Sequence, residues 1–113
     1  MAKKIDLHPG ETEIGVWTLF YLPPYGGKFN GTLTVTDRRV IYDASDDASF
    51  SGVLANKTAS GRLEIAKTDI RDIEVTRSLF HKRALLTLAD GSFHMFDRGA
   101  MSIDKVAEAM EAH

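Results

Sequence analysis

The sequence contains no cysteine among its 113 residues. This absence excludes disulfide bonds, cysteine-ligated zinc, iron–sulfur clusters and thiol catalysis together. Long apolar segments are also missing, because the longest uncharged run, residues 14–27, has 14 residues and includes Pro23-Pro24. A membrane-spanning helix needs about 20 apolar residues. The basic start at residues 1–6 lacks the apolar region of a signal peptide, so we expect a cytoplasmic location.

Neither sign of charge dominates, since 14 basic and 16 acidic residues give a formal charge of −2. Such a chain has no overall attraction for nucleic acid or for an acidic bilayer, so we expect no nucleic-acid partner. Hydrophobic residues make up 43% of the chain, which is enough to build a core. A chain of this length is the size of one domain, and we predict a single domain over residues 1–113.

Most of the chain alternates between apolar and polar residues with a period of two, which predicts a mainly β fold. The pattern predicts seven strands. They are expected at residues 14–22, in a hairpin over 29–43, at 63–65, at 72–77 and in a last hairpin around residues 90–91.

The first hairpin is expected to turn near residues 37–38. This turn pairs Val35 with Val40 and Leu33 with Tyr42 on the core face. The threonines at positions 32, 34 and 36 then fall on the solvent face.

The last hairpin carries the Asp-Gly pair at residues 90–91, which is typical of a two-residue type I′ turn. This turn places Leu86 opposite Met95 on the core face. The opposite face then carries Leu85 and Phe96 and is partly apolar. We therefore expect Leu85 and Phe96 to be covered by another element or to form an interface.

After Gly99 the period of the apolar residues changes to that of a helix. Ser102 is a suitable helix cap, and Asp104 suits the positive end of the helix dipole. The spacing predicts one amphipathic C-terminal helix of about three turns. Its apolar face is Ile103, Val106, Ala107 and Met110.

Four segments in this order resemble the pleckstrin-homology-like (PH-like) superfold, in particular the GRAM and bacterial PH-like domains. They are LHPGE at residues 7–11, GTLTVTDRRVIY at 31–42, the "D-I-x-x-I" bend at 69–73, and Asp-Gly at 90–91 followed by a helix. The resemblance covers nearly the whole chain. It implies a bent seven-stranded barrel or sandwich, closed at one end by the helix. It also implies a binding function, to phosphoinositides, to protein segments or to a second copy.

No catalytic, metal-binding or cofactor-binding motif is present. The four histidines lack the spacing of a metal site, and there is no G-x-S-x-G elbow and no Walker loop. We therefore expect neither an enzyme nor a bound cofactor. A small-molecule carrier or an enzyme is kept as a third alternative, which a deep polar pocket with His81 or His94 beside a carboxylate would favour.

Residues 75–89 contain Arg77, Lys82 and Arg83 with His81, and no carboxylate. These cations straddle a turn and are candidates to bind phosphate or a partner's carboxylates, with Lys28 as a further candidate. The alternative is an ordinary solvated turn. The expected second strand carries threonines where lipid-binding PH domains carry cations, so the usual head-group site of the family is not expected here.

The main hypothesis is a non-enzymatic PH-like binding module that acts through protein contacts or as a homodimer. Capture of a partner is expected by strand addition at a sheet edge or in a groove beside the helix. The alternative is a peripheral membrane adaptor that binds anionic lipid through the basic turn. The connection over residues 45–61 has 17 residues, a length that predicts either a disordered segment or a binding element.

Overall fold

The computed structural model describes residues 6–24, 27–44 and 62–112. In these ranges the chain forms seven strands in one antiparallel sheet, and one α-helix follows them. The mainly β fold with a single C-terminal helix is therefore confirmed. The long connection at residues 45–61, a candidate binding element, lies outside the described residues. The elements are β1 (Glu13–Leu22), β2 (Phe29–Thr36), β3 (Arg39–Ala44), β4 (Arg62–Ala66), the 3-10 turn η1 (Lys67–Asp69), β5 (Ile70–Arg77), β6 (Lys82–Leu88), β7 (Phe93–Asp97) and α2 (Asp104–Glu111).

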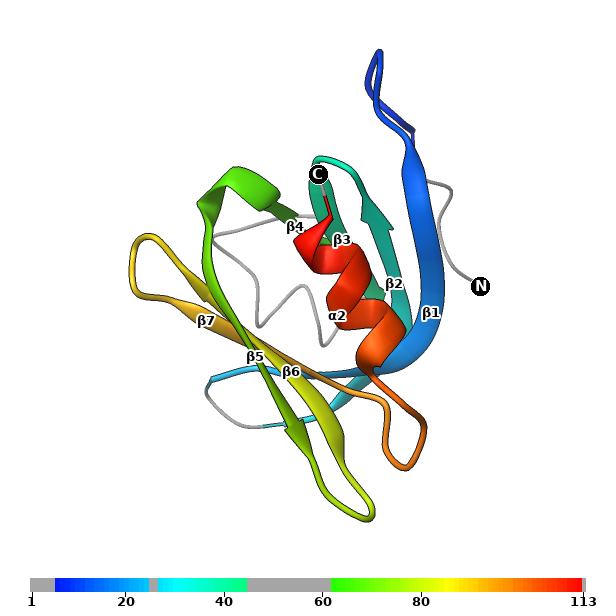
Figure 1. The fold of residues 1–113 in the computed structure, drawn as a ribbon, viewed down its shortest axis with the longest axis vertical. Coiled ribbons are helices and arrows are strands. Elements are labelled where there is room, and N and C mark those ends of the chain that lie inside the picture. Colours follow the sequence, from blue (N-terminus) through cyan, green and yellow to red (C-terminus); the bar gives the residue numbers. More distant parts are fainter. Residues whose placement is uncertain (1–5, 25–26, 45–61, 113) are drawn as a thin grey trace.

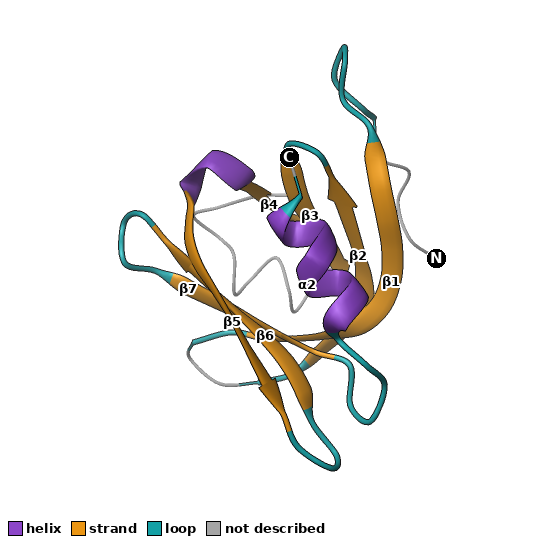
Figure 2. Ribbon diagram, in the orientation of Figure 1, coloured by secondary structure: helices purple, strands orange, loops and turns teal. Residues whose placement is uncertain are grey.

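The strands lie in the order β4-β3-β2-β1-β7-β6-β5, so the sheet has β4 and β5 at its edges. Figure 1 shows that β1 is long and strongly bent, which curls the sheet so that its two halves face each other. Helix α2 lies over the open side and contacts β1, β2 and β5 (Figure 1). In Figure 2 the helix is set against strands from both halves. The core lies between the curled sheet and this helix.

The first hairpin, β2–β3, has the expected register. Val35 lies opposite Val40 and Leu33 opposite Tyr42, and all four side chains are buried in the core. The other face of this hairpin differs from the expectation of a solvent face. Its residues Thr34, Thr36, Ile41 and Asp43 are also buried.

The turn between β6 and β7 has three residues, where the sequence predicts two. Leu88 donates its N–H to the carbonyl of Ser92 at 2.8 Å, and Gly91 donates to the carbonyl of Leu88 at 3.0 Å. Gly91 has φ +90°, a conformation that glycine adopts without strain. Asp90 accepts a hydrogen bond from the N–H of Ser92. Asp-Gly therefore forms the end of a three-residue loop, the next most common hairpin connection after the two-residue turn.

This extra turn residue shifts the register by one and reverses the face of every side chain in β7 relative to β6. Leu85 lies opposite Met95, and Ala84 lies opposite Phe96. Phe96 is completely buried in the core with Leu86. The expected placement of Phe96 beside Leu85 on the outer face is therefore wrong, because Phe96 lies in the core, whereas Leu85 does lie on the outer face.

Three aromatic rings form the centre of the core. The ring centroids of Tyr21, Tyr42 and Phe96 are 5.4 to 5.7 Å apart. The hydroxyl of Tyr42 donates to the carbonyls of Leu19 and Phe29, at 3.0 and 2.9 Å. Burial raises the pKa of Tyr42 above its ordinary value. The rings join strands β1, β3 and β7, which are distant in the sequence.

Helix α2 has eight residues, so it is about one turn shorter than expected. Ile103 precedes it, and the N–H of Asp104 donates to the Ser102 hydroxyl at 3.2 Å. The predicted apolar face is confirmed. Its buried residues are Ile103, Val106, Ala107, Ala109 and Met110.

A buried ion pair fixes the segment before β1 to the β2–β3 hairpin. The Glu11 side chain is 0% exposed and accepts from Arg39 Nη2 at 2.7 Å and Arg39 Nε at 2.7 Å. Thr36 donates its hydroxyl to the same carboxylate at 2.6 Å. Arg39 also pairs with Glu64, whose side chain is 49% exposed. These hydrogen bonds hold the pKa of Glu11 well below its ordinary value of 4.5.

Replacement of Glu11 by glutamine is expected to reduce the free energy of unfolding by about 3 kcal/mol, because it leaves the partly buried Arg39 without its main counter-charge. Since the folded-state pKa of Glu11 lies below its unfolded value, this carboxylate stabilises the wild type above pH 4.5 and loses its contribution as the pH falls. Urea unfolding between pH 3 and 7 measures both effects.

Glu64→Gln is the matched control, because it removes a carboxylate from the same arginine at a half-exposed position. We expect this variant to lose less than about 1 kcal/mol. Equal losses in the two variants would contradict a dominant role for the buried pair.

Candidate functional site

The outer edge of β5 is the first feature of the site. Among residues 6–24, 27–44 and 62–112, β5 pairs with β6 alone. Ser78 donates its N–H to the carbonyl of His81 at 2.9 Å, and hydrogen-bonded pairs alternate along an antiparallel ladder. The register therefore directs the backbone groups of Glu74 toward β6, and those of Ile73 and Val75 toward the free edge. These outward groups are available to pair with another extended chain.

A groove of about 270 Å³ lies between the first half of β5 and the C-terminal end of α2. Its apolar residues come from both elements, and charged residues stand around them. Ile70 and Ile73 are half-buried against the core, and Met110 is 2% exposed. The residues that line the groove are Lys67, Ile70, Arg71, Asp72, Ile73, Met110 and Glu111.

Lys67 lines this groove and holds the helix in place. Its side chain crosses from η1 to α2, where Nζ donates to the carbonyls of Ala109 at 2.6 Å and Ala112 at 2.5 Å. A cation suits this position, because the C-terminal end of a helix carries partial negative charge. Burial lowers the pKa of Lys67. Sequence reasoning did not identify Lys67, because its partners lie more than 40 residues away.

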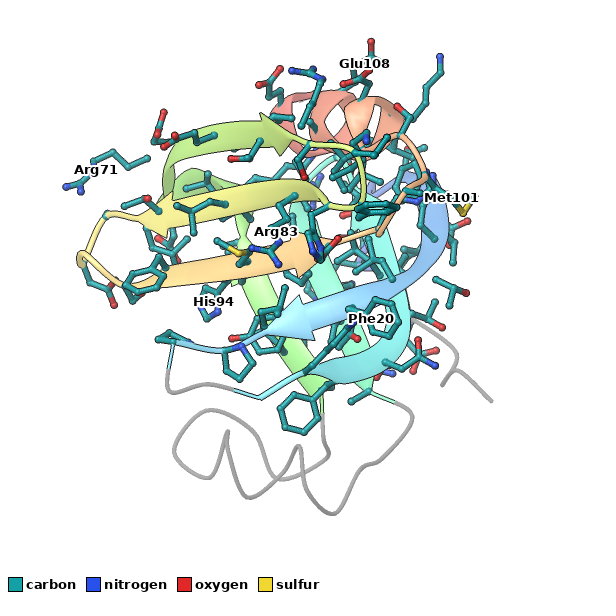
Figure 3. All side chains as sticks on the ribbon, turned by 90° about the horizontal axis from the view of Figure 1, so that it is seen from below. Phe20, Arg71, Arg83, His94, Met101 and Glu108 are labelled. Carbon is teal, nitrogen blue, oxygen red and sulfur yellow. The ribbon has the colours of Figure 1, made fainter. Side chains whose placement is uncertain are left out.

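Arg71 stands at the rim of the groove and is exposed. It lies at an irregularity in the β5–β6 pairing, between Ile70 and Asp72. Figure 3 shows its side chain extending away from the sheet. In the part of the chain that the structure describes, Arg71 has no ion-pair partner. Its charge is therefore available to a ligand in the groove.

The cations of the basic turn lie at the opposite end of β5, and two of them are paired. Arg77 contacts Asp104 of α2 at 2.5 Å, and Arg83 contacts Asp97 of β7 at 3.0 Å. His81 also contacts Asp97, through Nδ1 at 3.2 Å. The turn has no carboxylate in its own sequence, but the fold supplies two from elsewhere. Hydrogen bonds from Gly99, Arg83 and His81 outweigh burial and lower the pKa of Asp97.

The other two candidate cations have no carboxylate partner among the described residues. Lys82 donates Nζ to the carbonyl of Ser78. Lys28 lies over the ring of Phe20, with Nζ 4.1 Å from the ring centroid. Phe20 is paired with Asp97, and Asp97 with Arg83, so these residues share one row on the outer face. Figure 3 shows Phe20 and Arg83 on this face.

Leu85 belongs to a second row on the same outer face. It lies opposite Met95 of β7, which lies opposite Leu22 of β1. All three side chains are partly exposed. The expected apolar outer face therefore exists, with Met95 and Leu22 in place of Phe96.

The tip of the β5–β6 hairpin carries Leu79 and Phe80, which are 77% and 70% exposed. Met101, 61% exposed, lies on the connection from β7 to α2. Figure 1 shows this connection beside the hairpin tip, and Arg98 on it donates its N–H to the carbonyl of Lys82. Sequence reasoning missed these residues. The available signal was a pair of large apolar residues where a tight turn usually has polar ones.

The histidines lie apart from one another. His94 is buried, and its Nδ1 is 2.7 Å from the hydroxyl of Tyr21. His81 is at the surface beside Asp97. Residues 6–24, 27–44 and 62–112 contain no group of three side chains that could hold a metal ion. No helix in these ranges has the length and apolar character needed to cross a membrane.

Comparison with known proteins identifies a likeness of fold. No family model matches the chain, and no curated protein matches it either. Among solved structures, the chain is similar to the C-terminal domain of an unknown protein from Leishmania infantum, with a TM-score of 0.66 and 13% sequence identity. The match covers 90% of this chain and 84% of that domain. The chain therefore shares its mainly β, helix-capped architecture with that domain.

Replacement of Lys67 by methionine is expected to loosen α2 from the sheet. The variant keeps the aliphatic length of the side chain and loses two charge-assisted hydrogen bonds, so we expect a loss of about 2 kcal/mol in the free energy of unfolding. Amide hydrogen exchange in α2 is expected to become faster. Lys105→Met, at a position on α2 with an 82% exposed side chain, is the control and is expected to change stability by less than about 0.5 kcal/mol. Unchanged amide exchange in α2 of the Lys67 variant would show that this lysine does not hold the helix against the sheet.

Proposed function

We propose that this protein is a non-enzymatic binding module of the PH-like, GRAM-related type, which captures an extended segment of a partner protein. The observation that carries the proposal is the free edge of β5, which runs beside a groove with an apolar floor. Peptide recognition by strand addition needs both features: backbone groups for pairing and pockets for alternate side chains. Both occur at the same place on the described part of the molecule.

The geometry of the groove defines the kind of segment that fits. Backbone groups of Ile73 and Val75 pair with the incoming strand, so the segment is extended. Every second side chain of that strand then faces the groove, where Ile70, Ile73 and Met110 provide apolar contacts. A segment with alternating apolar residues is the best match.

Charge adds a second preference. Arg71 offers a guanidinium at the rim, whereas the Nζ of Lys67 is bonded to carbonyls of α2. Asp72 and Glu111 also line the groove, so the attraction for an acidic residue is local to Arg71. An acidic residue of the partner that reaches Arg71 forms a bidentate pair with it. We therefore propose that the preferred segment carries an aspartate or glutamate next to its apolar residues.

Self-association is a second candidate, which the row Leu22, Met95 and Leu85 supports. Two copies related by a two-fold axis would cover these residues with the same face of the partner. Leu85→Lys is expected to abolish a dimer detected by analytical ultracentrifugation. A monomer at high protein concentration in the wild type contradicts this candidate.

The groove is tested by selecting binders from a peptide display library. We expect selected peptides to share an extended apolar alternation with one acidic residue. Arg71→Glu is expected to weaken their binding at least about tenfold, because it replaces an attraction by a repulsion at the rim. Isothermal titration measures the change.

Lys82→Glu is the matched control, since it makes the same charge change in the same β5–β6 hairpin, outside the groove. This variant is expected to bind the selected peptides like the wild type. Equal weakening by both variants would show that net charge, and not the groove, governs binding. Selection of helical or basic peptides would contradict the proposed recognition.

A further inference from the structure

The most exposed large apolar side chains of the described residues gather around the end of the β5–β6 hairpin. Leu79, Phe80 and Met101 are 77%, 70% and 61% exposed. This tip lies beyond the far end of β5 from the groove, since six residues of extended chain separate Ile73 from Leu79, about 20 Å. It is therefore a separate surface from the proposed peptide site.

The hairpin holds its apolar tip in a defined position. Ser78 donates its N–H to the carbonyl of His81, and His81 donates its N–H to the hydroxyl of Ser78 at 3.2 Å. Lys82 adds a contact from Nζ to the carbonyl of Ser78. These bonds cross the base of the turn, so Leu79 and Phe80 remain at the outermost positions. The hydrogen bonds of the turn therefore keep both side chains exposed.

Positive charge surrounds the tip. Residues 77–83 and 97–104 together contain four Arg or Lys side chains and two aspartates, which leaves a surplus of two positive charges, with the histidine neutral. The whole chain has a formal charge of −2. Arg98 and Lys82 have no carboxylate partner among the described residues. A negatively charged partner is therefore attracted to this end of an otherwise acidic molecule.

The shape of the tip favours a fluid partner over a protein surface. A stable protein interface buries about 800 Å² on each side, and it needs a broad complementary face. Three protruding side chains on two adjacent loops present a narrow convex end instead. A lipid bilayer closes around such an end without a preformed pocket. Apolar insertion combined with cations at the head-group level is the usual basis of interfacial binding.

We infer that the β5–β6 tip is a membrane-docking element, in which Leu79, Phe80 and Met101 enter the interface of an anionic bilayer. Lys82 and Arg98 then lie at the level of the head groups. This mode requires negative surface charge and no particular head group. Docking through the tip leaves the β5–α2 groove outside the bilayer, so the two surfaces operate together or separately.

The test uses vesicles of phosphatidylcholine, with and without phosphatidylserine. We expect the full chain to sediment with the anionic vesicles and not with the neutral ones. Leu79→Ser with Phe80→Ser is expected to lower the binding constant at least about tenfold, because both insertion residues are lost. The matched control is Ile14→Ser with Val16→Ser, two residues that are 41% and 49% exposed on β1. The control is expected to bind like the wild type.

Insertion is measured directly by a single fluorescent label, because the chain has no natural cysteine. Phe80→Cys carrying an environment-sensitive dye is expected to shift to shorter wavelength with anionic vesicles, and Val16→Cys is not. No binding to anionic vesicles, or equal binding by the serine variant of the tip, would overturn the inference. Loss of binding in the β1 control to the same degree would do so as well. None of these outcomes tests the proposed peptide groove, since peptide binding is measured separately, without lipid.

Discussion

The structure depends on one geometric constraint: seven strands curl far enough to enclose a core, but their two edge strands do not pair with each other. A helix must therefore cover the open side. The side chain of Lys67 holds it there, because it reaches from the corner between β4 and β5 to the last carbonyls of α2. An unclosed sheet keeps a free edge, and an edge beside a helix makes a groove. The candidate site is a consequence of how the fold closes.

The same strand connects the two proposed surfaces. The first half of β5 lines the groove with Ile70 and Ile73, and its end leads into the exposed tip at Leu79 and Phe80. Between them, residues 72–77 of the strand pair continuously with β6. A module with both proposed surfaces would bring a captured protein segment to a membrane surface. The charge distribution agrees with separate roles for the groove and the tip, because the positive surplus is at the tip while the chain as a whole is acidic.

Local patterns predicted most of the fold. Alternation placed the β2–β3 hairpin with its correct pairs, and the helical period after Gly99 placed the apolar face of α2. The predicted register of the last hairpin was wrong, because Asp-Gly fits both a two-residue and a three-residue connection. The extra turn residue places Phe96 in the core. The candidate site was harder to predict from the sequence than the fold. Lys67, Asp97 and Asp104 act on partners far along the chain, so no window of sequence shows that Arg77 and Arg83 are paired.

The central claim is that an extended segment joins the sheet at β5. The most direct measurement is an NMR structure of the domain with a selected peptide bound. We expect contacts between the peptide backbone and the amides of Ile73 and Val75, with the peptide as an added strand next to β5 and its side chains against Met110. Contacts only with the outer face around Leu85, or with β4 at the other edge, would contradict it.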